Sequence, residues 1–151
     1  MKNWITALLA LALMAFVGCK KETDTDSSAF SCKIDGTSFS VKGVNAYATT
    51  FSTYFTVYGV NPDDNTETVY LSFPLGTKEG TYTLNGDFTG YFVDKNDVAY
   101  SNLWGQGGGT VTISKIDDTH VEGTFEINVY DSDTEAIKKA LTDGKFDVAF
   151  R

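Results

Sequence analysis

The chain has 151 residues, the usual size of one domain, and its hydrophobic (42%) and charged (21%) fractions are those of a folded protein. Two cysteines are too few for a disulfide scaffold. The formal net charge of −8 repels a phosphate backbone and therefore argues against general nucleic-acid binding.

The N-terminal segment has the pattern of a secretory signal. Residues 4–17 are apolar except for Thr6, and they follow a single lysine, Lys2. A membrane-spanning helix needs about 20 apolar residues, so this run is too short to span a bilayer. We therefore expect residues 1–18 to be a signal peptide that is removed on export.

The signal ends in Phe16-Val17-Gly18-Cys19, which resembles the lipobox of bacterial lipoproteins, although Leu is usual where Phe16 stands. The resemblance implies that Cys19 is acylated, for example by palmitate, and that two or more acyl chains anchor the protein stably in a membrane. The alternative is an ordinary signal peptide, with Cys19 free or bonded to Cys32.

Residues 19–29 follow as the predicted lipidated cysteine and a flexible tether, because residues 20–29 are polar and lack periodicity. The predicted location is the cell envelope, and we expect the outer membrane. The acidic stretch after Lys21 faintly resembles the signal that sends some Bacteroidota lipoproteins to the cell surface. The periplasmic side and the surface side both stay open.

From residue 30 onward, apolar and polar residues alternate with the period of a β-strand. One face of each run is apolar and the other is polar, which is typical of antiparallel sheets with one face in water. We expect residues 30–151 to form one all-β domain, a sandwich or flattened barrel of about nine strands, with Cys32 in its core. Alternating runs occupy 30–34, 37–41, 54–59, 69–73, 80–84, 91–93, 98–100, 110–114, 120–129 and 145–150.

Two local signals refine this expectation. Asp35-Gly36 between two alternating runs predicts a type I′ hairpin turn, which needs a positive φ at both positions. Ser132 and Glu135 have the spacing of a capping box, which predicts a short helix over residues 133–141 near the C-terminus. The alternative places residues 140–142 in the last strand.

Three short motifs carry a family resemblance: GTVTI at 109–113, GTF at 123–125 and TDGKF at 142–146. Together with the hairpin of residues 30–39, they resemble the closing third of a family of uncharacterised Bacteroidota lipoproteins. The motifs mark turns and strands. The resemblance therefore implies an all-β lipoprotein and transfers no catalytic residue.

Residues suited to catalysis or metal binding are sparse. His120 is the only histidine, and we expect a plain surface residue because a zinc site needs three or four ligands. The oxygen spacings at 63–67 and 131–135 lack the glycine and the final acid of a calcium loop. The glycine-rich segment 105–109 precedes a strand, so it is no phosphate loop. We expect no catalytic residue, metal or cofactor, and no enzyme.

The aromatic residues give the candidate site. Tyr54, Tyr58 and Tyr70 fall on the polar faces of predicted strands, and Trp104 adjoins the glycine-rich segment. Such side chains suit sugar stacking and protein interfaces, so these four are the predicted ligand-binding residues, although tyrosine is also common on the wet face of a sheet. Other aromatic residues fall near strand ends or loops: Tyr47, Tyr91, Tyr100 and Tyr130.

The predicted function is a non-enzymatic envelope lipoprotein, held on a membrane by its lipid anchor, that binds or scaffolds a glycan or an envelope protein. The alternative is a lipocalin-like carrier of a small apolar ligand. A carrier requires an apolar internal cavity, whereas a binding platform requires aromatic side chains gathered on one exposed face.

Overall fold

Strands make up most of the chain that the computed structural model describes, residues 27–63, 67–104, 106–135 and 138–151. The predicted signal peptide, Cys19 and most of the predicted tether lie outside these residues. The strands are β1 (Ala29–Ile34), β2 (Thr37–Lys42), β3 (Ala46–Phe51), β4 (Tyr54–Val60), β5 (Thr68–Pro74), β6 (Gly80–Thr83), β7 (Thr89–Val93), β8 (Ala99–Ser101), β9 (Gly108–Ile116), β10 (His120–Asp131) and β11 (Lys138–Ala149).

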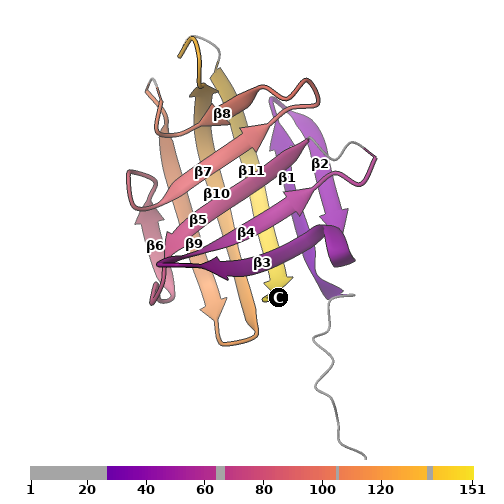
Figure 1. The fold of residues 1–151 in the computed structure, drawn as a ribbon, viewed down its shortest axis with the longest axis vertical. Helices are drawn as coiled ribbons and strands as arrows, with labels where there is room; N and C mark the ends of the chain where they lie inside the picture. The colour runs from indigo at the N-terminus through magenta and orange to yellow at the C-terminus, as the bar shows by residue number, and fades with distance from the viewer. Residues whose placement is uncertain (1–26, 64–66, 105, 136–137) are drawn as a thin grey trace, which may run out of the picture.

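All strand pairs are antiparallel, and the main order is β2-β1-β11-β10-β8-β7-β5-β4-β3, with β6 paired to β9 and β9 to β10. Figure 1 shows two layers: β3, β4, β5 and β7 form a front sheet that crosses a steeper back sheet of β1, β2, β9, β10 and β11. The predicted all-β class, a sandwich or flattened barrel, is confirmed.

The two sheets are joined at both sides of the molecule. On one side β10 forks, because residues 121–128 pair with β9 while Tyr130 and Asp131 pair with β8. On the other side the end of the chain meets β3, where Phe150 bridges Ala48 in parallel and the Arg151 amide donates to the Ala48 carbonyl at 2.9 Å. These contacts nearly close the sheet into a barrel.

The core lies between the two sheets and is rich in phenylalanine. The ring centroids of Phe30 and Phe125 lie 5.4 Å apart, and that of Phe73 in the front sheet lies 6.3 Å from that of Phe146 in the back sheet. Cys32 is buried among these side chains, as predicted, and burial raises the pKa of its thiol to about 12. The inward face of each alternating run therefore forms the core.

Glycine lets the two sheets approach closely at one inward position of the front sheet. A Cβ atom on Gly59 would lie 2.5 Å from Cδ1 of Phe30, too close for any side chain. The alternation of large residues in β4 is therefore interrupted where the phenylalanine of β1 fills the space.

The predicted hairpin between β1 and β2 is confirmed. Asp35 and Gly36 have φ angles of 49° and 84°, the left-handed pair that a type I′ turn requires. The Asp35 carboxylate also accepts hydrogen bonds from the Ala140 amide and from Nζ of Lys139, both at 2.9 Å. The turn therefore fastens the hairpin to β11.

The expectation of a short helix over residues 133–141 is wrong in the part that the structure describes. Residues 138–141 begin β11, which pairs with β1 on one edge and with β10 on the other. Pairing on both edges outweighs the helix propensity of this segment. At Asp131 one turn does form, because its carboxylate accepts the amides of Asp133 and Thr134 at 2.8 Å. Residues 136–137 lie outside the described residues.

One strand was not predicted. β3 has Ala46 and Ala48 on its inward face, and alanine gives a weak alternation signal.

No helix of the described residues has the length and apolar character needed to cross a membrane.

Candidate functional site

Four tyrosines from the four strands of the front sheet lie side by side on its outer face. Strand register places Tyr47 opposite Tyr58, Tyr58 opposite Tyr70, and Tyr70 opposite Tyr91. Consecutive ring centroids are 5.1, 5.5 and 4.7 Å apart, with interplanar angles of 20°, 29° and 10°. The tyrosines therefore form one continuous stack across the sheet.

Both ends of the stack are covered by further side chains. Trp104 meets Tyr91 edge to face, with ring centroids 6.0 Å apart and an interplanar angle of 83°. At the other end the guanidinium carbon of Arg151 lies 4.4 Å from the centroid of Tyr47, a cation–π contact. We call Tyr47, Tyr58, Tyr70, Tyr91 and Trp104 the aromatic row.

Stacking decides which atoms of the row a ligand can reach. The faces of the inner rings cover one another, so ring edges and hydroxyl groups are what the row presents to solvent. Burial, followed by the neighbouring Tyr91 and Tyr58, raises the pKa of Tyr70 to about 12. Its hydroxyl therefore stays protonated and can donate a hydrogen bond at physiological pH.

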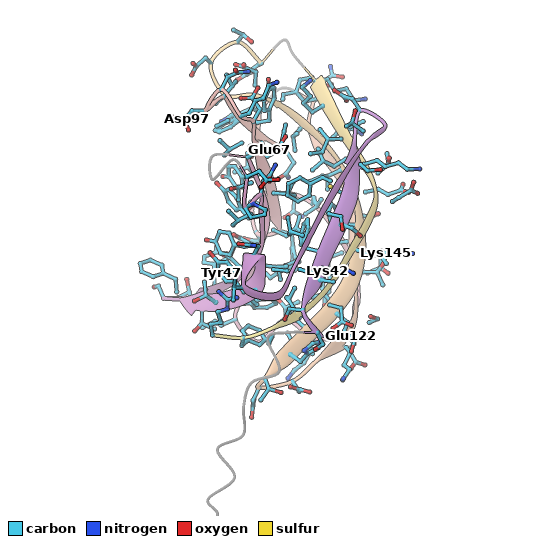
Figure 2. The ribbon with its side chains drawn as sticks, turned by 90° about the vertical axis from the view of Figure 1, so that its right-hand side faces the viewer. Lys42, Tyr47, Glu67, Asp97, Glu122 and Lys145 are labelled. Carbon is cyan, nitrogen blue, oxygen red and sulfur yellow. The ribbon has the colours of Figure 1, made fainter. Side chains whose placement is uncertain are left out.

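The outer face of the front sheet carries no charged side chain on its strands, although 21% of the chain is charged. The back sheet is different, because Lys42, Glu122 and Lys145 lie on its outer side, opposite Tyr47 (Figure 2). The outward residues of the front sheet are Tyr47, Thr49, Phe51, Tyr54, Thr56, Tyr58, Val60, Thr68, Tyr70, Ser72, Pro74, Thr89, Tyr91 and Val93. We call these residues, with Trp104, the uncharged face.

One end of the uncharged face is openly apolar. Phe51 is 83% exposed and pairs with Tyr54, which is 39% exposed. Leu75, 49% exposed, is held beside them because its amide donates to the Thr53 carbonyl at 2.8 Å. Exposed aromatic and aliphatic side chains of this kind commonly mark interaction surfaces.

The structure brings three of the four predicted ligand-binding residues into one row. Tyr58 and Tyr70 stack directly, and Trp104 joins them through Tyr91, while Tyr54 lies on the same face at its apolar end. Alternation in the sequence places Tyr47 and Tyr91 only near strand ends or loops. Tyr91 could have been assigned outward from its inward neighbours Gly90 and Phe92, but Tyr47 depended on the unpredicted strand.

A separate hollow of about 550 Å³ lies at one end of the barrel, beside the C-terminus. Its wall includes Phe55, Ile116 and Phe150, and Lys78 and Asp118 lie at its rim. The hollow opens to solvent. It is therefore an amphipathic depression at the end of the core, whereas a lipocalin-like carrier would need an enclosed apolar cavity.

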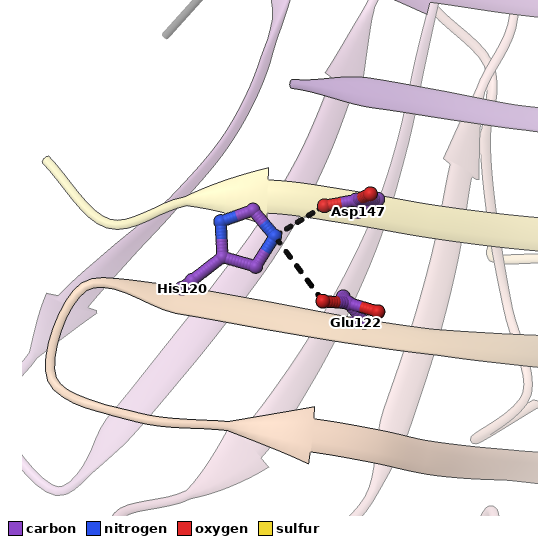
Figure 3. Close-up of side chains that lie close together, drawn as sticks. All are labelled: His120, Glu122 and Asp147. Atoms are coloured by element: carbon purple, nitrogen blue, oxygen red, sulfur yellow. Dashed lines mark hydrogen bonds and ion pairs between the residues drawn. The ribbon is translucent and has the colours of Figure 1, made fainter. Parts of the chain in front are cut away.

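His120 belongs to a small polar cluster on the outer side of the back sheet (Figure 3). Its Nε2 is hydrogen-bonded to Oδ1 of Asp147 and lies 3.9 Å from Oε1 of Glu122. The histidine side chain is only 20% exposed, so it is more enclosed than a plain surface residue. The sequence does not reveal this cluster, because Asp147 comes from a different strand, β11.

The fold and these surfaces define an all-β, barrel-like domain with an uncharged aromatic face. Residues 26–148 match the family model described as a domain of unknown function (DUF6252), and the chain belongs to that family. No curated protein and no solved structure matches it significantly. The predicted family of unknown function is therefore confirmed, while its Bacteroidota lineage stays a prediction.

Proposed function

We propose that the protein is a non-catalytic binding protein of the cell envelope that recognises a protein partner through the uncharged face. The observation that carries the proposal is that the strands of this face carry no charged residue in an acidic chain, together with the continuous aromatic row that Arg151 covers at one end. Interface centres are depleted in charged residues and enriched in tyrosine, tryptophan, phenylalanine and arginine. The uncharged face is rich in tyrosine, includes Phe51 and Trp104, and has Arg151 against its edge.

The geometry of the row favours a protein over a glycan. A sugar ring stacks on an open aromatic face, but the faces of Tyr58 and Tyr70 are covered by neighbouring rings. Hydroxyl groups along the row can bond to a partner's backbone, and Phe51 offers an exposed apolar anchor. Both features suit a polypeptide surface.

Anchoring through lipidated Cys19 completes the proposal. The family match begins at residue 26, so the predicted signal and residues 20–25 of the predicted tether lie outside the family domain. Residues 20–28 would then link the acylated cysteine to the first strand. We propose the outer membrane as the location, with the uncharged face free to meet another envelope protein.

Photocrosslinking in the native envelope tests this proposal. A benzophenone side chain replacing Phe51 should give a discrete protein adduct, whereas the same group replacing Lys145 on the back sheet should not. A Tyr58→Ser change should reduce the Phe51 adduct by roughly fivefold, because one interface tyrosine is worth about 1 kcal/mol. Equal labelling from both faces, or no adduct from Phe51, would contradict a protein partner.

Retention of the protein on envelope polysaccharide is the corresponding test for a glycan ligand. If the protein binds the polysaccharide and Trp104→Ala weakens that binding, the ligand of the uncharged face is a glycan and the proposal of a protein partner is rejected. The second candidate is a carrier that holds a small apolar ligand in the open hollow beside Phe55 and Phe150, without the enclosed cavity of a lipocalin-like carrier. It predicts that a lipid co-purifies with the chain and that Phe150→Ala releases it.

A further inference from the structure

We propose that His120, Glu122 and Asp147 form a binding site for a divalent transition-metal ion, represented by Zn²⁺. The site lies on the back sheet and is independent of the proposed partner surface. The three side chains offer one imidazole nitrogen and two carboxylate groups, and their ligand atoms lie within 4.8 Å of one another. Figure 3 shows both carboxylates directed at the same ring nitrogen, Nε2.

Strand geometry brings the ligands together. His120 and Glu122 are two residues apart on β10 and therefore point to the same side of the sheet. Asp147 of β11 lies directly opposite Glu122 in the strand register. In a tetrahedral zinc site with bonds near 2.1 Å, ligand atoms are about 3.4 Å apart. Side-chain rotation alone can therefore bring the three ligand atoms to this spacing.

The backbone beneath the cluster is held on both sides. β10 pairs with β9 and β11, and β11 pairs in turn with β1. Glu122 and Asp147 are paired with strands on both sides, and His120 is paired with Ala149 of β11. This pairing holds the Cα positions of the ligands, which limits the entropy lost when the ion binds. An isolated group of acidic residues in a loop has no such support, and it also lacks the imidazole.

The ligand types select the ion. Calcium and magnesium prefer oxygen ligands alone, whereas an imidazole with two carboxylates suits zinc and its first-row neighbours. Two carboxylates also balance the charge of a divalent cation. Three protein ligands leave a position for water, and Asp147, the most exposed of them at 58%, lies open to solvent.

Lys115 is the competing cation at this site. Its Nζ donates to Oε1 of Glu122 at 3.1 Å, and this hydrogen bond, with the charge of the carboxylate, raises the pKa of the lysine. A metal ion that binds Glu122 must therefore compete with the Lys115 ammonium group for its carboxylate. Removing the lysine charge should therefore strengthen metal binding, which distinguishes a metal site from a purely structural ion-pair network.

Titration of the full chain with Zn²⁺ tests the proposal, using detergent and a purification tag that contains no histidine. Because His120 is the only histidine, its imidazole ¹⁵N signals report on the site alone. We expect one zinc ion per chain and a change in the His120 imidazole ¹⁵N signals that marks coordination through Nε2. His120→Gln and Asp147→Asn should each weaken binding by about tenfold or more, and Lys115→Gln should tighten it by about fivefold.

Asp143→Asn is the matched control, because Asp143 lies on the same strand but pairs with Lys33 at 2.8 Å and takes no part in the cluster. Its zinc affinity should equal that of the unaltered chain. The proposal is overturned if no one-site binding occurs below about 1 mM Zn²⁺. It is also overturned if the histidine signals do not respond, or if Lys115→Gln leaves the affinity unchanged.

Discussion

Asp35 shows how one residue serves both a local turn and a distant strand. Its backbone adopts the positive φ that the hairpin needs, while its carboxylate holds the amide of Ala140 and the ammonium of Lys139. Partial burial raises the pKa of this carboxyl. The two hydrogen bonds and the lysine charge together lower the pKa by more than burial raises it, so the net pKa is below its usual value. The ionised form therefore stabilises the fold.

Asp35→Asn should lower the free energy of unfolding at pH 7 by about 0.5–1 kcal/mol, since a partly exposed charge pair contributes little more. A carboxyl with a lowered folded pKa stabilises above its unfolded pKa and loses that contribution as pH falls. The difference between the two chains should thus begin to shrink at about pH 4, the unfolded pKa, and disappear as pH falls through the lowered folded pKa. Urea unfolding of both chains between pH 3 and pH 7 measures this difference in the free energy of unfolding. A difference independent of pH would contradict stabilisation by the ionised Asp35 carboxylate.

Among the elements, the front sheet is held by its aromatic row as well as by hydrogen bonds. Cross-strand aromatic pairs each add about 0.5–1.5 kcal/mol beyond the area they bury. Tyr70 and Tyr91 form the closest pair, at 4.7 Å. The row therefore has two roles that can be separated, sheet stability and partner binding.

A double-mutant cycle with Tyr70→Ala and Tyr91→Ala should give a coupling energy of about 0.5–1.5 kcal/mol in urea unfolding. The control cycle pairs Tyr47→Ala with Tyr91→Ala, because these two rings stack on different tyrosines and belong to strands that are not adjacent. Its coupling should be close to zero. Equal couplings in the two cycles would show that the stack itself adds nothing.

For the whole molecule, closure depends on the last two residues. Phe150 packs against Phe55 with ring centroids 5.6 Å apart, and Arg151 supplies the amide that bonds to Ala48. The C-terminus therefore joins the back sheet to the edge of the front sheet. Without it, β3 would be an open edge on that side.

Deleting Phe150 and Arg151 should lower the free energy of unfolding by about 2–4 kcal/mol, because it removes the Phe150–Phe55 contact and the backbone hydrogen bonds to Thr119 and Ala48. Amide hydrogens of β3 should then exchange faster than in the intact chain. Arg151→Ala is the control, since it keeps the backbone bond to Ala48 and removes the cation–π contact with Tyr47, worth about 0.5–1 kcal/mol, and a long hydrogen bond to the Gly43 carbonyl. Unchanged β3 protection in the deletion would contradict closure by the C-terminus.

The sequence by itself determined the all-β class, most strands, the Asp35-Gly36 turn and the burial of Cys32. These features are local, because the alternation of a strand reports which side faces the core. Only the tertiary structure decided the aromatic row, the His120 cluster and the strand at residues 138–141. Each of these depends on strand order and register, which join residues far apart in the chain. Alternation within one strand carries no information about its neighbours.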